Sequence, residues 1–92
     1  MTRNKQLRQP SAELRGVVAD NIRQFRGKNG LSQEEFAATC GLHRTYIGSI
    51  ERSERNLTLS TLELLSRHVG LTVPELLTRQ RRDGPTDNES DQ

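Results

Sequence analysis

The sequence has few of the features that would indicate a disulfide-stabilised or membrane-embedded protein. Its 92 residues include a single cysteine, no tryptophan and three other aromatic side chains. One cysteine excludes an intramolecular disulfide framework. No run of about 18 apolar residues is long enough to span a bilayer, and no segment has the pattern of a secretory signal. We therefore expect one small cytoplasmic domain with a modest core and no membrane partner.

Motifs for catalysis and metal binding are also missing. The serine, histidine and acidic residues do not form a nucleophile elbow, a phosphate loop or a metal motif. Cys40, His43 and His68 are too scattered for a typical ligand set, so we interpret Cys40 as a core thiol; a redox role would require an exposed thiolate. The sequence therefore predicts no enzyme, no metal, no cofactor and no small-molecule substrate.

Charge is unevenly distributed along the chain. The net charge is +2, but the last ten residues contain four acidic and no basic side chains. Residues 1–82 therefore carry 14 basic and 8 acidic side chains, an excess of +6. Such an excess favours a polyanionic partner, although it is also common on an ordinary solvated surface. Composition divides the chain into a flexible basic arm (1–10), a folded domain (11–82) and a disordered acidic tail (83–92).

Apolar spacing and capping residues predict an all-α domain of five helices. The first helix is expected to start after a cap at Ser11 and to end near Asn29, before Gly30. A loop from Arg55 to Leu59 precedes the fourth helix, which should begin at a capping box of Ser60 and Glu63 and end at Gly70. The expected inward side chains of these two helices are Leu14, Val18, Ile22, Phe25, Leu62, Leu65 and Val69.

A short fifth helix is predicted next. Thr72 and Glu75 should cap it, and its first turn tolerates Pro74 because the missing amide is not needed there. The surrounding apolar residues exceed what a short helix needs to dock on one neighbour, which suggests a twofold contact between two copies. They could equally complete the core of a single copy. These residues are Leu71, Val73, Leu76 and Leu77.

The segment from residue 31 to residue 51 is the most informative. Ser32 and Glu35 can cap each other's backbone amides and so start the second helix. Gly41 then supplies a sharp turn, and His43 is a candidate cap for the third helix. Two short helices joined by a glycine turn are typical of a DNA-binding helix-turn-helix. The expected inward side chains of the second helix are Phe36, Ala37 and Cys40.

The third helix has one polar and one apolar face. At about 100° per residue, five residues share an arc of about 140°, while Ile47 and Ile50 lie opposite and Tyr46 lies at the border. Arginine can donate two bonds to guanine, and a threonine methyl can contact the thymine methyl. Any amphipathic helix of a small bundle also has a polar face, so this pattern alone is not decisive. The five residues are Arg44, Thr45, Gly48, Ser49 and Arg52.

Gly48 costs the helix roughly 0.5 to 1 kcal/mol relative to alanine. A residue without a side chain in the middle of the outward face therefore needs an explanation. Close approach of the backbone to DNA is one candidate.

Three strings together carry a family resemblance: IRQFRGKNGLSQEEFA, CGLHRTYIGSIE and LSTLELLSRHVGLTVPELL. From Val18 to Leu77 the chain resembles the lambda-repressor/Cro-like helix-turn-helix family, also called the xenobiotic-response-element type. It is most similar there to the controller proteins of restriction–modification systems, in which HRTYIGSIER followed by RN is familiar. Other phage-type and plasmid-type regulators carry similar strings.

The resemblance implies a role for each matching position. It assigns base reading to Arg44, Thr45 and Ser49, and a structural ion pair to Arg26 and Glu51. Two departures are Ser53, where many relatives have glycine, and Gly48, where a larger residue is common. Ser53 suggests a less taut loop after the third helix, because serine tolerates the left-handed conformation less well. The implied contacts to the DNA backbone are Gln33, His43, Tyr46, Arg52, Arg55 and Asn56.

The expected function is sequence-specific binding of duplex DNA by a homodimer at a roughly palindromic operator. The regulator would repress by occlusion or activate by touching RNA polymerase. An antitoxin that binds both DNA and a toxin is an alternative within the same class. From a different class, a protein-interaction adaptor or RNA-associated bridging factor could use this fold without reading bases.

Overall fold

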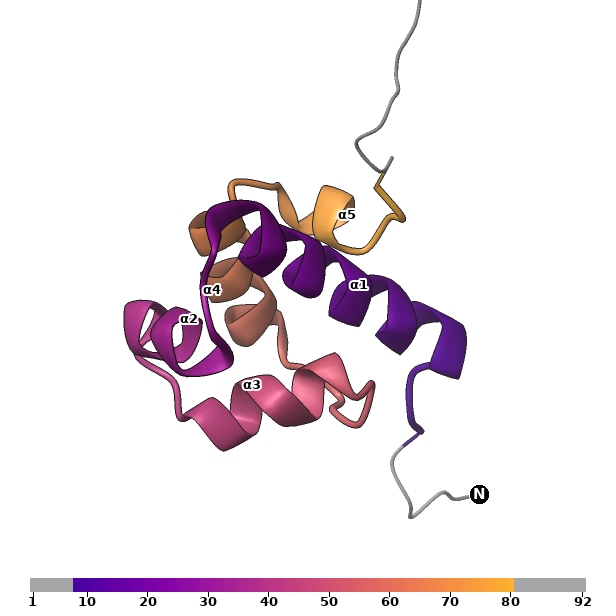
Figure 1. Ribbon diagram of the computed structural model, residues 1–92. Helices are drawn as coiled ribbons and strands as arrows, with labels where there is room; N and C mark the ends of the chain where they lie inside the picture. Colours follow the sequence, from indigo (N-terminus) through magenta and orange to yellow (C-terminus); the bar gives the residue numbers. More distant parts are fainter. Residues whose placement is uncertain (1–7, 81–92) are drawn as a thin grey trace, which may run out of the picture.

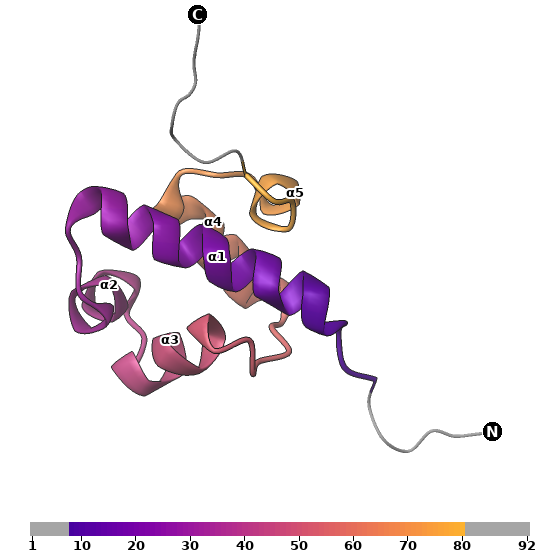
Figure 2. The same ribbon diagram turned by 45° about the vertical axis from the view of Figure 1, so that its right-hand side comes forward.

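The computed structural model describes residues 8–80, which form five helices and contain no strand. The predicted all-α, five-helix fold is therefore confirmed. α3 lies along one edge of the domain and α5 at the opposite edge, and α1 crosses between them (Figure 1 and Figure 2). Most of the predicted basic arm and the whole predicted acidic tail lie outside the described residues. The helices are α1 (Ala12–Asn29), α2 (Gln33–Cys40), α3 (Arg44–Glu51), α4 (Leu59–Val69) and α5 (Val73–Leu76).

Local capping interactions start most of the helices where the sequence predicts. The Ser11 hydroxyl accepts a hydrogen bond from the amide of Leu14 at 3.0 Å and caps α1. At α5, Thr72 and Glu75 form the predicted capping box. The predicted glycines also end α1, α2 and α4. Each of these interactions spans only a few residues, which is why sequence patterns identify them.

The predicted start of α4 is wrong. The helix is capped by Thr58, whose hydroxyl accepts from the amide of Thr61 at 3.2 Å, and Leu59 is its first residue. Ser60 therefore lies inside the first turn and forms no capping box with Glu63. Threonine and serine are both good caps, so local chemistry allowed either start. The helix therefore begins two residues earlier than predicted, and its first residue, Leu59, is 78% exposed.

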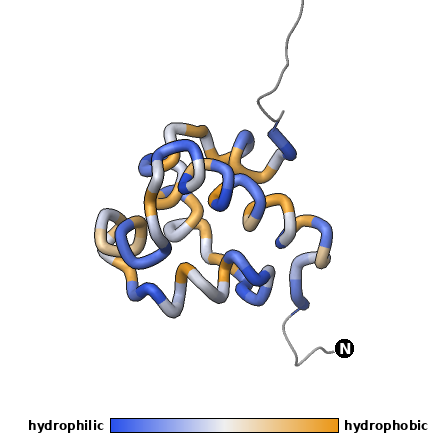
Figure 3. The backbone as a smooth tube through the Cα atoms, viewed as in Figure 1, coloured by the Kyte–Doolittle hydropathy of each residue, from blue (hydrophilic) through white to orange (hydrophobic). Residues whose placement is uncertain are grey.

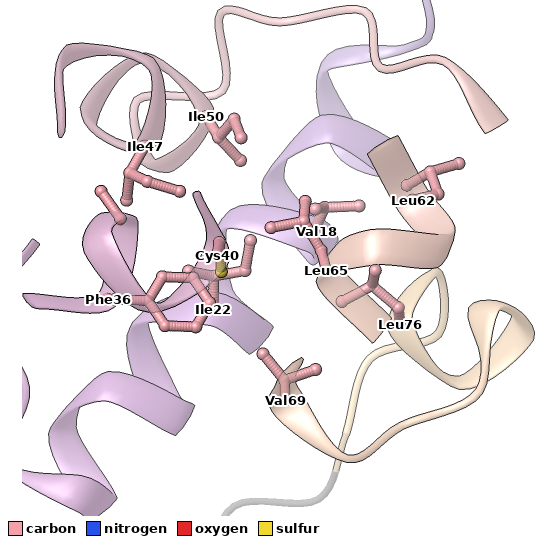
Figure 4. Packing of buried hydrophobic residues seen from close by; sticks show 11 residues of the cluster. Val18, Ile22, Phe36, Cys40, Ile47, Ile50, Leu62, Leu65, Val69 and Leu76 are labelled. Atoms are coloured by element: carbon pink, nitrogen blue, oxygen red, sulfur yellow. The ribbon is translucent and has the colours of Figure 1, made fainter. Parts of the chain in front are cut away.

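One hydrophobic core joins all five helices (Figure 4). Hydrophobic and hydrophilic stretches alternate along the helices (Figure 3). Leu14 was expected in the core but is 38% exposed, because it lies in the first turn of α1 and only lines a shallow apolar cleft with Leu57 and Leu77. Phe25 is partly buried, with its ring centroid 5.7 Å from that of Phe36. The core cluster is Val18, Ile22, Phe36, Ala37, Cys40, Ile47, Ile50, Leu62, Leu65, Val69 and Leu76.

Two polar side chains of α1 bind the end of α5 and the residues that follow it. Asn21 is buried, and its Nδ2 donates to the carbonyl oxygens of Leu76 at 2.8 Å and Thr78 at 3.0 Å. Asp20 accepts from Arg79 at 2.7 Å and also pairs with Arg23. The hydrogen bond from Arg79 lowers the pKa of Asp20, and that from Arg23 adds to it against the opposing effect of burial. These contacts fix the chain after α5 against α1.

Candidate nucleic-acid interface

The α2 and α3 helices form the predicted helix-turn-helix. The Ser32 hydroxyl accepts from the amide of Glu35 at 2.9 Å, and the Glu35 carboxylate accepts from the amide of Ser32 at 2.8 Å. Gly41 ends α2 with φ 72°, a conformation that glycine adopts without steric cost. His43 then caps α3, because its Nδ1 accepts from the amide of Thr45 at 3.1 Å. Hydrogen bonds between residues close in sequence therefore fix both the end of α2 and the start of α3.

The apolar side of α3 points into the core. Ile47 is completely buried and Ile50 nearly so, and Figure 4 shows both directed from α3 toward the other core side chains. Arg44 and Thr45 are exposed on the side of α3 away from this core. Among residues 8–80, the Arg44 side chain forms no hydrogen bond or ion pair. Its guanidinium is thus available to a ligand.

Ser49 does not belong to the exposed strip. It is only 6% exposed; its Oγ donates to the carbonyl oxygen of Tyr46 at 2.7 Å and accepts from Arg55 Nε at 2.8 Å. The prediction that the Ser49 side chain faces outward is therefore wrong. Ser49 lies at the margin of the polar arc, where the loop after α3 can cover it. Arg55 of this loop lies over Ser49 and donates the hydrogen bond to its hydroxyl.

Arg55 is held at the end of α3 by a second contact. Its guanidinium carbon lies 4.8 Å from the centre of the Tyr46 ring, a distance typical of a cation–π interaction. Tyr46 is half-buried and Arg55 remains exposed. The loop cation is therefore positioned while its charge stays accessible.

Gly48 also departs from its expected surroundings. A Cβ atom added there would lie 3.2 Å from Arg52 Nη1 and 3.4 Å from Gln33 Oε1. The place of a side chain at position 48 is thus taken by the ends of two neighbouring side chains. Gly48 is buried beneath them rather than open at the surface.

The ion pair expected between Arg26 and Glu51 is present. Arg26 Nε donates to Glu51 Oε2 at 2.6 Å, and Arg26 Nη2 donates to Oε1 at 2.7 Å. Gln33 Nε2 donates to the same Oε1 at 2.9 Å, and Arg23 donates to the Glu51 carbonyl oxygen. The buried carboxylate therefore links α1, α2 and α3.

The two partners shift each other's protonation equilibria. Burial alone would raise the pKa of Glu51, but the hydrogen bonds from Arg26 and Gln33 outweigh it and hold that pKa below its ordinary value of 4.5. The hydrogen bond to Glu51 likewise raises the pKa of Arg26 despite its burial. Both groups are therefore charged near neutral pH.

The loop after α3 contains a strained residue. Ser53 has φ 63°, the left-handed conformation in which glycine is favoured. Its amide still donates to the carbonyl oxygen of Ile50 at 2.9 Å, and the next amide, of Glu54, donates to that of Ser49 at 3.0 Å. Arg52 forms an exposed ion pair with Glu54 at 3.1 Å. Ser53 thus adopts a conformation that glycine would take without steric cost.

The proposed dimer residues have different surroundings. Leu76 is completely buried in the core of a single copy, so its assignment to a dimer interface is wrong. Its helix, α5, packs against both α1 and α4, and such contacts between distant segments are not visible in the sequence. Leu71, Val73 and Leu77 are half-buried at the edge of the core. Leu59 was predicted to lie in a loop, but it is an exposed apolar residue at the start of α4.

Other chemistry finds little support in the part of the chain that the structure describes. No group of three histidine, cysteine or acidic side chains there is arranged to hold a metal. Cys40 is buried, and burial raises the pKa of its thiol, which disfavours a reactive thiolate. Within residues 8–80, none of the helices has the length and apolar character needed to cross a membrane.

These features define a helix-turn-helix domain, and comparison with known proteins agrees: the helix-turn-helix family pattern matches residues 22–76. The chain belongs to this family. Its relatives include the control protein C.SmaI of Serratia marcescens, which is 54% identical over 68 residues, covering 74% of this chain and 81% of the relative.

Solved structures point to the same group. The hypothetical transcription factor NHTF from Neisseria is 39% identical with a TM-score of 0.68, over 83% of this chain and 88% of the other. The restriction–modification controller protein C.Esp1396I, solved as a tetramer in complex with its natural 35-base-pair operator, is 37% identical with a TM-score of 0.60. That match covers 70% of this chain and 88% of the other. The predicted resemblance to controller proteins is confirmed.

Proposed function

We propose that this protein is a transcriptional regulator of the restriction–modification controller type, which binds a specific duplex operator through α3. The observation that carries the proposal is the exposed pair Arg44 and Thr45 on a helix anchored from behind by Ile47 and Ile50. The similarity to a controller protein solved on its operator supports it. Such a protein acts where the DNA is, in the cytoplasm, and needs no catalytic group.

Within this proposal, the exposed residues have two kinds of role. Arg44 and Thr45 read base edges in the major groove. The surrounding side chains and the amides at the start of α2 grip phosphates and set the register of the protein on the duplex. Ser49 is omitted because it is buried in hydrogen bonds of its own. The phosphate-contacting set is Gln33, His43, Tyr46, Arg52, Arg55 and Asn56.

A homodimer would place two recognition helices in successive major grooves, about 34 Å apart. We assign the contact to Leu71, Val73 and Leu77, which lie half-exposed around α5. The tetramer formed by the similar controller protein supports self-association. The position of the footprint relative to the promoter distinguishes repression by occlusion from activation through contact with RNA polymerase.

Salt dependence tests the proposal most directly. A duplex selected by the protein from a random-sequence library should bind less tightly as salt rises, with a log–log slope of about −0.9 per phosphate neutralised. With six to ten phosphate contacts, affinity should fall by about 10³ to 10⁵ between about 50 and 200 mM salt. Fluorescence anisotropy titrations would measure the slope. If no duplex is selected, or if affinity is independent of salt, the protein is an adaptor rather than a DNA-binding regulator.

Arg44→Ala should separate base reading from phosphate binding. The substitution is expected to cost roughly 1 to 3 kcal/mol on the selected duplex and to leave binding to a scrambled duplex nearly unchanged. Arg67→Ala is the matched control, because Arg67 is an exposed arginine of α4 outside the candidate interface. Equal losses on both duplexes would assign Arg44 to the phosphate-contacting set instead.

A further inference from the structure

Gly48 lies beneath two long side chains of the candidate interface. Gln33 reaches it from the first residue of α2, and Arg52 folds back on it from the residue that caps the end of α3. The two atoms nearest a Cβ at position 48 would be Arg52 Nη1 and Gln33 Oε1, at 3.2 and 3.4 Å. The shorter distance is closer than an ordinary van der Waals contact between such atoms. A methyl group would therefore shift at least the guanidinium, by a few tenths of an ångström.

Both side chains make hydrogen bonds through their other atoms. Gln33 Nε2 donates to Glu51, which is itself held by Arg26, so the orientation of the Gln33 amide is set. Arg52 donates through Nε and Nη2 to Glu54 at 3.1 and 3.3 Å. Its remaining nitrogen, Nη1, is the atom next to Gly48. The absence of a side chain at position 48 thus lets the Gln33 amide and the Arg52 guanidinium lie against α3.

We propose that Gly48 is a positioning residue for DNA binding that acts through Gln33 and Arg52. It makes no contact with the duplex of its own. Because Gly48 has no Cβ, the Gln33 amide and the Arg52 guanidinium can occupy the space beside it. There they are placed to bind phosphates of the DNA backbone. This inference rests on the proposed function and explains why α3 carries a residue that weakens it as a helix.

Gly48→Ala tests the inference, because its effects on stability and on binding should have opposite signs. Alanine favours the helix, and the exposed Arg52 side chain can move by the few tenths of an ångström that the methyl needs, so the melting temperature should rise. A shift of a few tenths of an ångström weakens the hydrogen bonds of the Arg52 guanidinium and the Gln33 amide to phosphates, so affinity for the selected duplex should fall by up to about tenfold. Gly27→Ala is the control: Gly27 lies in α1, and a Cβ there would meet nothing within 4 Å. It should raise the melting temperature and leave binding unchanged.

A second experiment asks whether the added methyl acts through the two side chains. In a protein already carrying Gln33→Ala and Arg52→Ala, Gly48→Ala should change affinity by less than about twofold, because the displaced groups are gone. A full loss in that background would mean that the methyl itself collides with DNA, and would overturn the inference. Unchanged binding by Gly48→Ala alone would overturn it too, while leaving the proposed function intact. Failure of the unmodified protein to bind any duplex would overturn both.

Discussion

Replacing Arg26 with methionine is expected to lower the free energy of unfolding by about 3 to 5 kcal/mol near neutral pH. Glu51 is almost completely buried, and Arg26 supplies two of its three side-chain hydrogen bonds. Removing the guanidinium leaves a buried carboxylate with Gln33 as its hydrogen-bond partner. A small domain has about 5 to 15 kcal/mol of stability in total, so the variant should lose a large share of it.

The same variant should reverse the pH dependence of stability. In the unmodified protein the pKa of Glu51 is lowered, so its contribution is present above the unfolded pKa and is lost as pH falls through the folded value. In Arg26→Met, burial dominates and the pKa of Glu51 rises. Acidification toward about pH 5 should then stabilise the variant, because protonation removes the buried charge.

Urea denaturation at several pH values would measure both effects. Arg52→Met is the control, since it removes an ion pair that is exposed on both sides and should cost less than about 1 kcal/mol. Replacing both core partners, with Arg26→Met and Glu51→Leu together, should recover much of the loss. Equal losses for Arg26→Met and Arg52→Met would contradict this account of the buried pair.

The parts of the fold that sequence patterns predicted depend on short-range interactions. Ser11, Ser32 and Thr72 cap helices by bonding amides three residues away, and such pairs are visible in a sequence. The start of α4 was predicted wrongly because Thr58 and Ser60, two residues apart, are both suitable caps. Local chemistry was therefore ambiguous, and only the folded chain shows which hydroxyl meets an amide.

The errors at the candidate site come from contacts between distant residues. Helical periodicity correctly placed Arg44 and Thr45 outside and Ile47 inside. It could not show that Arg55 returns from the loop to cover Ser49, nor that Gln33 of another helix lies over Gly48. A single helical wheel describes one helix in isolation, so the margins of its polar face are decided by its neighbours.

The anchoring of α3 leads to the second large effect. Ile47→Ala should lower the free energy of unfolding by about 2 to 5 kcal/mol, because Ile47 is fully buried between α3 and the rest of the core. Leu59→Ala is the matched control: Leu59 is 78% exposed, so its truncation should change stability by no more than about 0.5 kcal/mol. Thermal or urea unfolding compares the two.

Because Ile47 faces away from the exposed strip, its loss should affect DNA binding through folding alone. The apparent dissociation constant of Ile47→Ala should rise by the inverse of its folded fraction, and the slope of log affinity against log salt should stay that of the unmodified protein. Binding titrations paired with circular dichroism at the same temperature give both quantities. An altered salt slope at equal folded fraction would show that Ile47 sets the phosphate contacts as well as the stability of the domain. If Ile47→Ala were as mild as Leu59→Ala, the recognition helix would have to be held mainly by Ile50 and the Glu51 network.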